Sequence, residues 1–250
     1  MLNIVVPMAG HGSRFAKAGY TAPKPLIPIH GVPMIRLVID NLRPSMDHRF
    51  IFLCQAAHIE QFALDKRLCA WAPGAEVRSV AAVTEGAACT VLLARDLIDS
   101  DEPLMIANCD QYIDVAIDEY LQAAAAPDGM IMTMIDKDPK WSFVGFDQSG
   151  RVSQVVEKQV ISDQATVGIY NFTRGRDFVS AADAMIAKDL RVNNEFYVAP
   201  VYNELIELGA EIGTYSIGAA AQGMHGLGIP ADLDAFLALE LSRTVTGHLS

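Results

Sequence analysis

The sequence predicts an α/β fold in which helices cover both faces of a mostly parallel sheet that carries an antiparallel extension. Short apolar segments rich in β-branched residues alternate with segments of helical periodicity in the first half. After residue 128 the strands become shorter and are joined by turns such as 147–150. A chain of 250 residues suits one such unit. We therefore expect a single domain over 1–250, with halves 1–128 and 129–250.

The expected elements follow from these patterns. Residues 3–7, Asn-Ile-Val-Val-Pro, are an apolar run bounded by turn residues and typical of a buried strand. In the first half we expect further strands at 49–54, 75–83 and 103–107, and helices at 34–42, 56–68 and 86–97. In the second half we expect strands at 130–134, 141–146, 151–157, 166–172 and 212–217, and helices at 174–188, 194–208 and 232–242.

Composition limits the class of protein. Hydrophobic residues make up 51% and charged residues 20%, as in ordinary globular proteins. No apolar run reaches the roughly eighteen residues that span a bilayer, and no basic leader opens the chain, so we expect a cytoplasmic protein without a membrane partner. The four cysteines, Cys54, Cys69, Cys89 and Cys109, lack metal spacing and are expected to be core residues in a reducing compartment.

Net charge limits the partners. A formal charge of -11 argues against nucleic acid, whose binding needs a basic surface. A small nucleotide needs only a local positive pocket, which Arg14, Lys24 and Lys158 could form.

A glycine-rich loop follows the first predicted strand. Gly10 and Gly12 permit positive φ and close approach of backbone N–H groups to an anion, while Arg14 and Lys24 add positive charge. Phe15 stands where the dinucleotide fingerprint needs its third glycine, and no P-loop lysine follows. The loop therefore predicts a different kind of phosphate cradle; the alternative is a tight turn with solvated basic side chains.

The complete string is more specific. Gly10-x-Gly12-x-Arg14-Phe15, then 23–26 (Pro-Lys-Pro-Leu) and 31–35 (Gly-Val-Pro-Met-Ile), resembles the signature of sugar-phosphate nucleotidylyltransferases, or nucleotide-sugar pyrophosphorylases. The resemblance implies a Rossmann-like three-layer sandwich (GT-A-like) and a loop that wraps a nucleoside triphosphate. It implies that Arg14 contacts the leaving phosphates and Lys24 lies against them. The implied nucleotide-binding loop is Met8, Ala9, Gly10, His11, Gly12 and Ser13.

The next motif is Asn108-Cys109-Asp110, after the predicted strand 103–107. In parallel sheets ligands gather at the carboxyl ends of strands, so Asn108 and Asp110 should lie near the cradle. The resemblance implies that Asp110 is catalytic and binds Mg²⁺, which suits one or two carboxylates plus phosphate oxygens. The alternative is an aspartate that caps a following helix.

Acceptor-binding residues are expected in the second half. Glu157-Lys158 and the segment around Gly168 resemble the family's Glu-Lys motif and glycine-aromatic strand, which hold the sugar phosphate. Glu157 would take sugar hydroxyls, Lys158 the phosphate, and Gly168 would allow close approach; a surface ion pair is the alternative. Glu195 is either an acceptor contact or an ordinary acid in the first turn of helix 194–208.

Two segments depart from the family pattern. Gly226 stands where many members carry a second Mg²⁺-binding aspartate, so the site has one carboxylate. Thr84, Glu85, Gly86 and Ala87 resemble the element that packs on the nucleobase, but Ala81 replaces a base-reading glutamine. This disfavours dTTP and leaves CTP, UTP and GTP open. Gln55 could read a base edge, and Glu85 could accept from a base amino group.

The expected activity is transfer of a nucleotidyl group to a sugar 1-phosphate or other phosphomonoester, with release of pyrophosphate and with Mg²⁺ as cofactor. A glycosyltransferase is an alternative, although Asn108-Cys109-Asp110 lacks the first acid of a D-x-D motif. A catalytically weak nucleotide-sugar-binding regulatory protein is another. The resemblance implies precursors of surface polysaccharides as acceptors, but the acceptor and the oligomeric state stay open, a homo-oligomer included.

Overall fold

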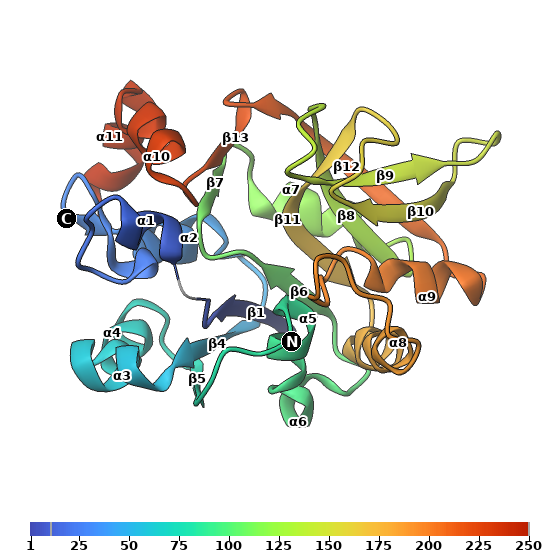
Figure 1. Ribbon diagram of the computed structural model, residues 1–250, viewed down its shortest axis with the longest axis horizontal. Coiled ribbons are helices and arrows are strands. Elements are labelled where there is room, and N and C mark those ends of the chain that lie inside the picture. Colours follow the sequence, from blue (N-terminus) through green and yellow to red (C-terminus); the bar gives the residue numbers. More distant parts are fainter. Residues whose placement is uncertain (11, 250) are drawn as a thin grey trace.

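An eleven-stranded sheet organises the computed structural model, which describes residues 1–10 and 12–249. The order along the sheet is β5-β4-β1-β6-β11-β8-β12-β13-β7, and β9 joins β10 to β11. Figure 1 shows the β9–β10 hairpin projecting from one end. The strands are β1 (Leu2–Met8), β4 (His48–Gln55), β5 (Glu76–Val80), β6 (Leu104–Ala107), β7 (Gln111–Ile113), β8 (Gly129–Ile135), β9 (Ser142–Phe146), β10 (Val152–Glu157), β11 (Gln164–Phe172), β12 (Ile212–Ala220) and β13 (Gly223–Gly226).

Parallel pairing occurs in both halves of the chain, with four adjacent parallel strands in the first half. β5, β4, β1 and β6 run parallel to one another, and β12 runs parallel to β8. β11 lies antiparallel between β6 and β8, and β10 pairs antiparallel with β9. The predicted α/β fold with a mostly parallel sheet and an antiparallel extension is therefore confirmed.

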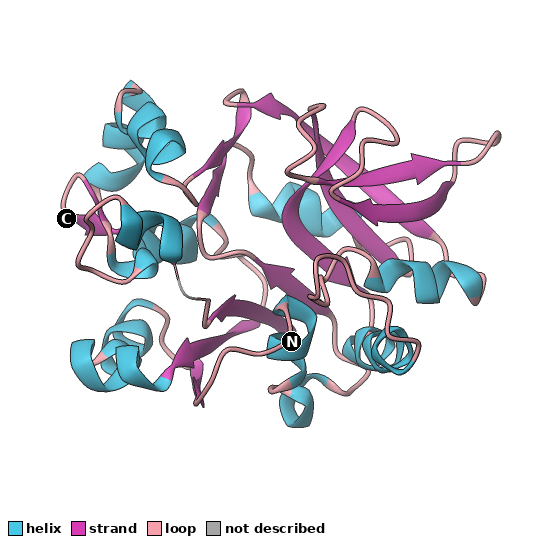
Figure 2. Ribbon diagram, viewed as in Figure 1, coloured by secondary structure: helices cyan, strands magenta, loops and turns pink. Residues whose placement is uncertain are grey.

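Helices cover both faces of this sheet (Figure 2). α2, α4 and α7 pack on one face, and α5, α6, α8 and α9 pack on the other. The helices are α1 (Ser13–Lys17), α2 (Met34–Asn41), α3 (Ala56–Phe62), α4 (Leu64–Trp71), α5 (Ala87–Leu92), α6 (Arg95–Ile98), α7 (Ile117–Ala123), α8 (Gly175–Ala187), α9 (Val201–Glu207), α10 (Pro230–Leu237) and α11 (Glu240–Gly247). A 3₁₀ turn η1 (Lys24–Leu26) precedes the small hairpin of β2 (Pro28–Ile29) and β3 (Val32–Pro33). Among the described residues, none of the helices combines the length and hydropathy needed to cross a bilayer.

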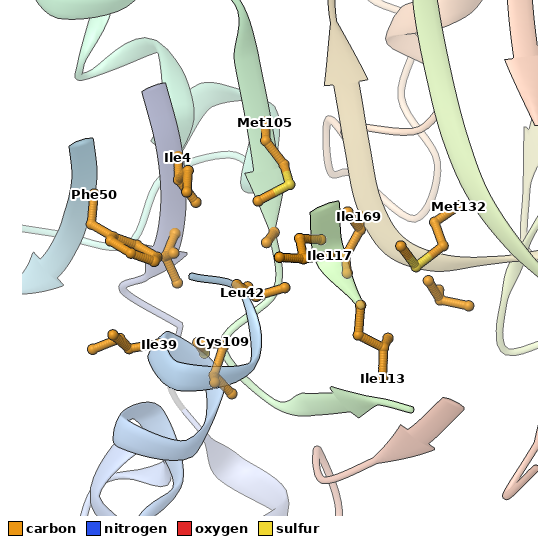
Figure 3. Packing of buried hydrophobic residues seen from close by; sticks show 14 of the residues in the cluster. Ile4, Ile39, Leu42, Phe50, Met105, Cys109, Ile113, Ile117, Met132 and Ile169 are labelled. Atoms are coloured by element: carbon orange, nitrogen blue, oxygen red, sulfur yellow. The ribbon is translucent and has the colours of Figure 1, made fainter. Parts of the chain in front are cut away.

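Alternating side chains of the strands supply the two cores. Ile4 of β1 belongs to the core beneath α2, whereas the next residue, Val5, belongs to the core on the opposite face. Figure 3 shows Ile4, Phe50 and Met105, from three adjacent strands, pointing toward Leu42 at the end of α2. This double burial explains why these strands are continuous apolar runs.

A third, smaller core joins the beginning of the chain to its end. Phe15 of α1 and Ile27 after η1 share it with Leu227, Leu233 and Phe236 from the last part of the chain. Figure 1 accordingly shows α10 beside α1 and α2. This core holds the glycine-rich loop and the segment after β13 in one place.

Several predicted elements differ from the structure. The helix expected at 56–68 is split by Ala63, whose φ of 47° is left-handed, and 86–97 and 232–242 are each two helices. The helix expected at 194–208 begins only at Val201, because Pro200 lacks the N–H that a helix interior requires. The strand expected to end at 83 ends at Val80.

Candidate nucleotide site

A cavity of about 380 Å³ opens at the carboxyl ends of β1 and β6. Most of the residues predicted to bind a nucleotide line it, although they come from separate parts of the chain. The lining residues are Pro7, Met8, Ala9, Gly10, Gly12, Ser13, Lys24, Pro25, Val83, Thr84, Gly86, Ala87, Thr90, Cys109 and Glu195. His11, predicted in the same loop, lies outside the described residues.

The side chain of Gln55 holds the glycine-rich loop through two hydrogen bonds. The Nε2 atom of Gln55 donates to the carbonyl oxygens of Ala9 and Gly10, at 2.9 Å each. Both N–H groups of the amide are thereby used, so only the Oε1 atom remains for a ligand. Gln55, predicted to read a base edge, therefore supports the loop and can face a base only as an acceptor.

Gly12 adopts a left-handed conformation with φ of 59°, and α1 starts directly after it. An added Cβ at Gly12 would lie 3.4 Å from the Cβ of Lys24, so the loop rests against that lysine. Arg14 is exposed on α1 and lies outside the cavity lining, but its charge reaches Lys24 and lowers the pKa of Lys24 slightly.

Lys24, which lines the cavity, forms an ion pair with Asp110, which like Asn108 lies outside the lining. The Nζ atom of Lys24 lies 2.8 Å from Oδ2 of Asp110, and both side chains are about one-quarter exposed or less, at 24% and 21%. Burial is the largest single effect and lowers the pKa of Lys24, but the charge of Asp110, the Cys109 side chain and the hydrogen bond to Asp110 together raise it by more. The net pKa is therefore raised, and the lysine stays charged. Asp110 precedes β7, not a helix, so the helix-cap alternative is wrong.

Cys109 lines the same cavity as a neutral thiol. Burial raises the pKa of Cys109 to about 11. Of the other cysteines expected in the core, Cys54 is buried, but Cys89 is only half-buried and Cys69 is exposed. The prediction of four core cysteines is therefore wrong for Cys69.

Asn108 is held against Gly168 of β11. The backbone N–H of Asn108 donates to the carbonyl of Gly168 at 3.0 Å. An added Cβ at Gly168, whose φ is 79°, would lie 2.0 Å from Nδ2 of Asn108. The space that this glycine leaves is thus filled by the Asn108 amide, which it positions at the edge of the site.

The wall formed by 84–88 is clamped to Phe196. The N–H of Phe196 donates to the carbonyl of Glu85 at 2.8 Å, and the N–H of Ala88 donates to the carbonyl of Phe196 at 3.0 Å. Thr84 donates its hydroxyl to the Gly86 carbonyl at 2.9 Å. The carboxylate of Glu85 is 67% exposed and pairs with Arg191 at 3.3 Å.

Of the predicted acceptor residues, Glu195 lines the cavity, whereas Glu157, Lys158 and Gly168 do not. The Ser142 hydroxyl donates to the buried carboxylate of Glu157, and burial raises the pKa of Glu157, with that hydrogen bond offsetting it in part. The Nζ of Lys158 lies 4.6 Å from the ring centroid of Tyr197 and donates to its hydroxyl oxygen. Among the described residues Glu157 and Lys158 do not pair with each other, so the ion-pair alternative is wrong.

Glu195 connects the two sides of the site. It lines the cavity, and its charge contributes to the raised pKa of Glu157. Its backbone pairs with Val192 across a turn in which Asn193 and Asn194 have positive φ. Glu195 therefore lies in a loop, and its alternative assignment to the first turn of a helix is wrong.

Three residues at or beside the site belong to no motif in the sequence: Tyr197, Ser142 and Thr90. Each of the three contacts a predicted site residue through its hydroxyl group: Tyr197 contacts Lys158, Ser142 contacts Glu157, and Thr90 contacts Thr84. Only Tyr197 could have been suspected from the sequence, because it lies two residues after Glu195. The Thr90 hydroxyl contacts that of Thr84 at 2.6 Å inside the cavity wall.

Comparison with known proteins identifies the family of the chain. The family described as nucleotidyl transferase matches residues 4–195, well over half of the chain. Mannose-1-phosphate guanylyltransferase catalytic subunit beta of Danio rerio is 26% identical over 185 residues, 69% of this chain and 50% of that protein. The bifunctional protein GlmU of Burkholderia thailandensis is 27% identical over 223 residues, 85% of this chain and 46% of that protein. The chain thus spans about half the length of these curated relatives.

Solved structures share the fold. A nucleoside-diphosphate-sugar pyrophosphorylase from Vibrio cholerae RC9 has a TM-score of 0.80 at 27% identity, covering 94% of this chain and 100% of that one. The inositol-1-phosphate CTP transferase of T. maritima has a TM-score of 0.72 at 15% identity, covering 98% and 96%, and shows the fold alone. The motif string, the cavity that it lines and the family match agree, and the chain belongs to the nucleotidyl transferase family.

Proposed function

We propose that the chain transfers a nucleotidyl group from a nucleoside triphosphate to a phosphate monoester, a sugar 1-phosphate or a related compound, and releases pyrophosphate. The observation that carries this proposal is Lys24, which lines the cavity together with the glycine-rich loop and pairs with Asp110. An ammonium and a carboxylate side by side there offer one partner for phosphate oxygens and one for a cation. The first half of the chain would hold the nucleotide and the second half the acceptor.

Positioning and charge neutralisation are the work of the protein in this reaction. The described part of the loop, residues 8–10 and 12–13, presents backbone N–H groups to the triphosphate. Lys24 neutralises charge that develops on the leaving pyrophosphate, and Arg14 reaches the outer phosphates from α1. A phosphate monoester is already an anion at neutral pH and needs no general base.

The residues present fit a divalent cation. An added Cβ at Gly228 would lie 2.5 Å from Oδ2 of Asp110, so this glycine leaves room for the carboxylate. Among the described residues no group of three or more His, Cys, Asp or Glu side chains converges. Mg²⁺ suits such a sparse set, because phosphate oxygens and waters complete its coordination. When bound at Asp110, it would supply charge stabilisation to the phosphates.

The acceptor would lie between Glu195 and the pair Glu157 and Lys158. Lys158 would hold its phosphate, and Glu157 would accept from hydroxyl groups. Gly168, by keeping Asn108 in place, would shape the boundary between acceptor and nucleotide. We place the reaction in the cytoplasm, because nucleoside triphosphates are its donors. Its product would be an activated precursor of surface polysaccharides.

Incubation with each triphosphate, Mg²⁺ and a panel of phosphomonoesters tests the proposal. Pyrophosphate release that depends on both substrates is expected. Release of a nucleoside diphosphate from a nucleotide sugar would indicate a glycosyltransferase. Binding of triphosphates without turnover across the panel would indicate a regulatory protein and would contradict the proposed reaction.

Glu157→Gln is expected to stabilise the protein at neutral pH while weakening acceptor binding. Because burial raises the folded-state pKa of Glu157, the folded state holds the proton more tightly, and stability falls as pH rises through the ordinary glutamate range. The variant should therefore unfold at a higher temperature at pH 7, and the difference should vanish below about pH 4. The exposed Glu76→Gln is the control; equal thermal shifts at both pH values would contradict this prediction.

Tyr197→Phe is expected to raise the KM for the phosphomonoester about two- to tenfold, the worth of one hydrogen bond of roughly 0.5–1.5 kcal/mol. The ring that Lys158 covers is kept, so kcat should not change. Lys158→Ala should have a larger effect on the same KM. Tyr215→Phe, a tyrosine packed on Tyr120 outside the site, is the control. An unchanged KM in Tyr197→Phe would show that this contact does not position the lysine.

A further inference from the structure

We propose that Asn41 and Asn203 are positioning residues, each of which completes the free edge of a strand that carries one half of the site. The inference rests on the proposed function. Asn41 lies on α2 and contacts β7, the strand that follows Asp110. Asn203 lies on α9 and contacts β10, the strand that ends at Glu157. Figure 1 shows α2 beside β7 and α9 beside β10.

The two asparagines make the same pair of hydrogen bonds. The Nδ2 atom of Asn203 donates to the Val155 carbonyl oxygen at 2.8 Å, and the Val155 N–H donates to Oδ1 of Asn203 at 2.7 Å. The Nδ2 atom of Asn41 donates to the Ile113 carbonyl oxygen at 2.8 Å, and the Ile113 N–H donates to Oδ1 of Asn41 at 2.9 Å. A side-chain amide offers the donor and the acceptor of a peptide group, so each asparagine takes the place of a neighbouring strand.

Both strands need such a partner. Within the described ranges 1–10 and 12–249, β7 pairs with β13 alone, and β10 pairs with β9 alone, so each has a free edge. Ile113 and Val155 are nonetheless buried, at 0% and 1% exposed. A buried N–H or C=O group without a partner is costly, because water cannot replace the missing bond. Loss of either asparagine should therefore shift or loosen its strand.

The bonds to β10 affect the proposed acceptor residues. Val155 lies two residues before Glu157 and three before Lys158. Lys158 has a left-handed backbone with φ of 56°, which is strained for a residue with a Cβ, and its N–H donates to the Trp141 carbonyl at 2.9 Å. Such a conformation persists only where the surrounding structure holds it. A strand fixed at Val155 would therefore keep the lysine and the neighbouring carboxylate in place for the acceptor.

The bonds to β7 affect the proposed donor side. β7 has three residues, begins directly after Asp110 and ends at Ile113. On its other side the N–H of Leu227 donates to the Asp110 carbonyl at 2.8 Å. Asp110 is the ion-pair partner of Lys24, which lines the cavity. A shift of β7 would thus reach the proposed triphosphate contacts, whereas β10 belongs to a different part of the sheet.

Shifts in two different Michaelis constants test the inference. Asn203→Ala is expected to raise the KM for the phosphomonoester about tenfold and to change the KM for the triphosphate by less than about twofold. Asn41→Ala is expected to raise the KM for the triphosphate about tenfold and to change the KM for the phosphomonoester by less than about twofold. Each variant is the control for the other, because both remove the same two bonds from a half-buried position on a helix. A general loss of stability would not separate the two constants.

Hydrogen exchange at the two edge amides provides a readout without turnover. The Ile113 N–H should lose protection in Asn41→Ala, and the Val155 N–H should lose it in Asn203→Ala, because each then lacks its acceptor. Unchanged protection would overturn the inference. If an alanine variant does not fold, Asn41→Asp or Asn203→Asp keeps the side-chain volume and one acceptor, and the same division between the two KM values is expected.

The failures are distinguishable. Suppose that the wild type releases pyrophosphate, but each variant changes both KM values equally or changes neither. That result would overturn the inference and leave the proposed function standing. No pyrophosphate release by the wild type, across the triphosphates and phosphomonoesters tried, would overturn the proposed function and the inference with it.

Discussion

Lys24→Ala is expected to lower kcat/KM for pyrophosphate release about 10²- to 10³-fold. In the proposed reaction Lys24, which lines the cavity, would face the phosphates, and loss of one fixed charge at a developing anion costs roughly 3–4 kcal/mol of barrier. Pyrophosphate release at saturating and at limiting triphosphate would separate an effect on kcat from an effect on KM.

Lys17→Ala is the matched control, since Lys17 is exposed on α1 close in sequence and carries the same charge. The thermal midpoint of both variants should be recorded, because Asp110 loses its partner when Lys24 is removed. Equal turnover in the two variants would contradict the proposal that Lys24 binds phosphate.

Gly86→Ala is expected to destabilise the chain by about 3 kcal/mol and to weaken triphosphate binding at least tenfold. Gly86 has φ of 135°, and an added Cβ would lie 2.3 Å from the carbonyl oxygen of Phe196 and 2.5 Å from its nitrogen. These backbone atoms cannot rotate away, so either the clamp on Phe196 opens or the wall of the cavity moves.

Thermal unfolding and triphosphate titration measure the two effects. For a chain of this length the expected fall in the unfolding midpoint is about 6–12 °C. Gly150→Ala is the control, because Gly150 also has positive φ, 82°, but nothing lies within 4 Å of its added Cβ. The control should cost only about 1–2 kcal/mol. An equal loss in both variants would mean that backbone strain, and not the contact with Phe196, is what matters.

The sequence predicts the central strands well because their residues are buried on both faces. β1, β4 and β6 each lie within two residues of the predicted bounds, since unbroken β-branched and aromatic runs admit few other structures. The short strands β7 and β13 were not predicted. β7 has three residues and β13 contains two glycines, so neither carries a periodic pattern, and their pairing depends on a partner more than 100 residues away.

The break between α3 and α4 could not be predicted from the sequence either. Ala63 is an excellent helix former, yet it adopts φ of 47° between α3 and α4, because packing of α4 into the core overrides local preference. Pro200 did carry a signal, because a proline is tolerated at a helix start and not in its interior.

The residues of the glycine-rich loop could be identified from the sequence, but the side chains that surround the loop in the fold could not. Lys24 and Asp110 are 86 residues apart, and the expectation that they meet came from the convergence of parallel strands. Tyr197 belongs to none of the recognised motifs. Its position depends on the turn at 193–194, which is a tertiary feature.

The clamp on Phe196 has a thermodynamic consequence. One peptide segment bonds the wall at Glu85 and Ala88, carries Glu195 into the cavity and presents Tyr197 to Lys158. If the proposed reaction is correct, this segment links the two substrates. By whatever factor a bound nucleotide changes the affinity for the acceptor, a bound acceptor then changes the affinity for the nucleotide by the same factor. Ordered addition during turnover would be the kinetic expression of that linkage.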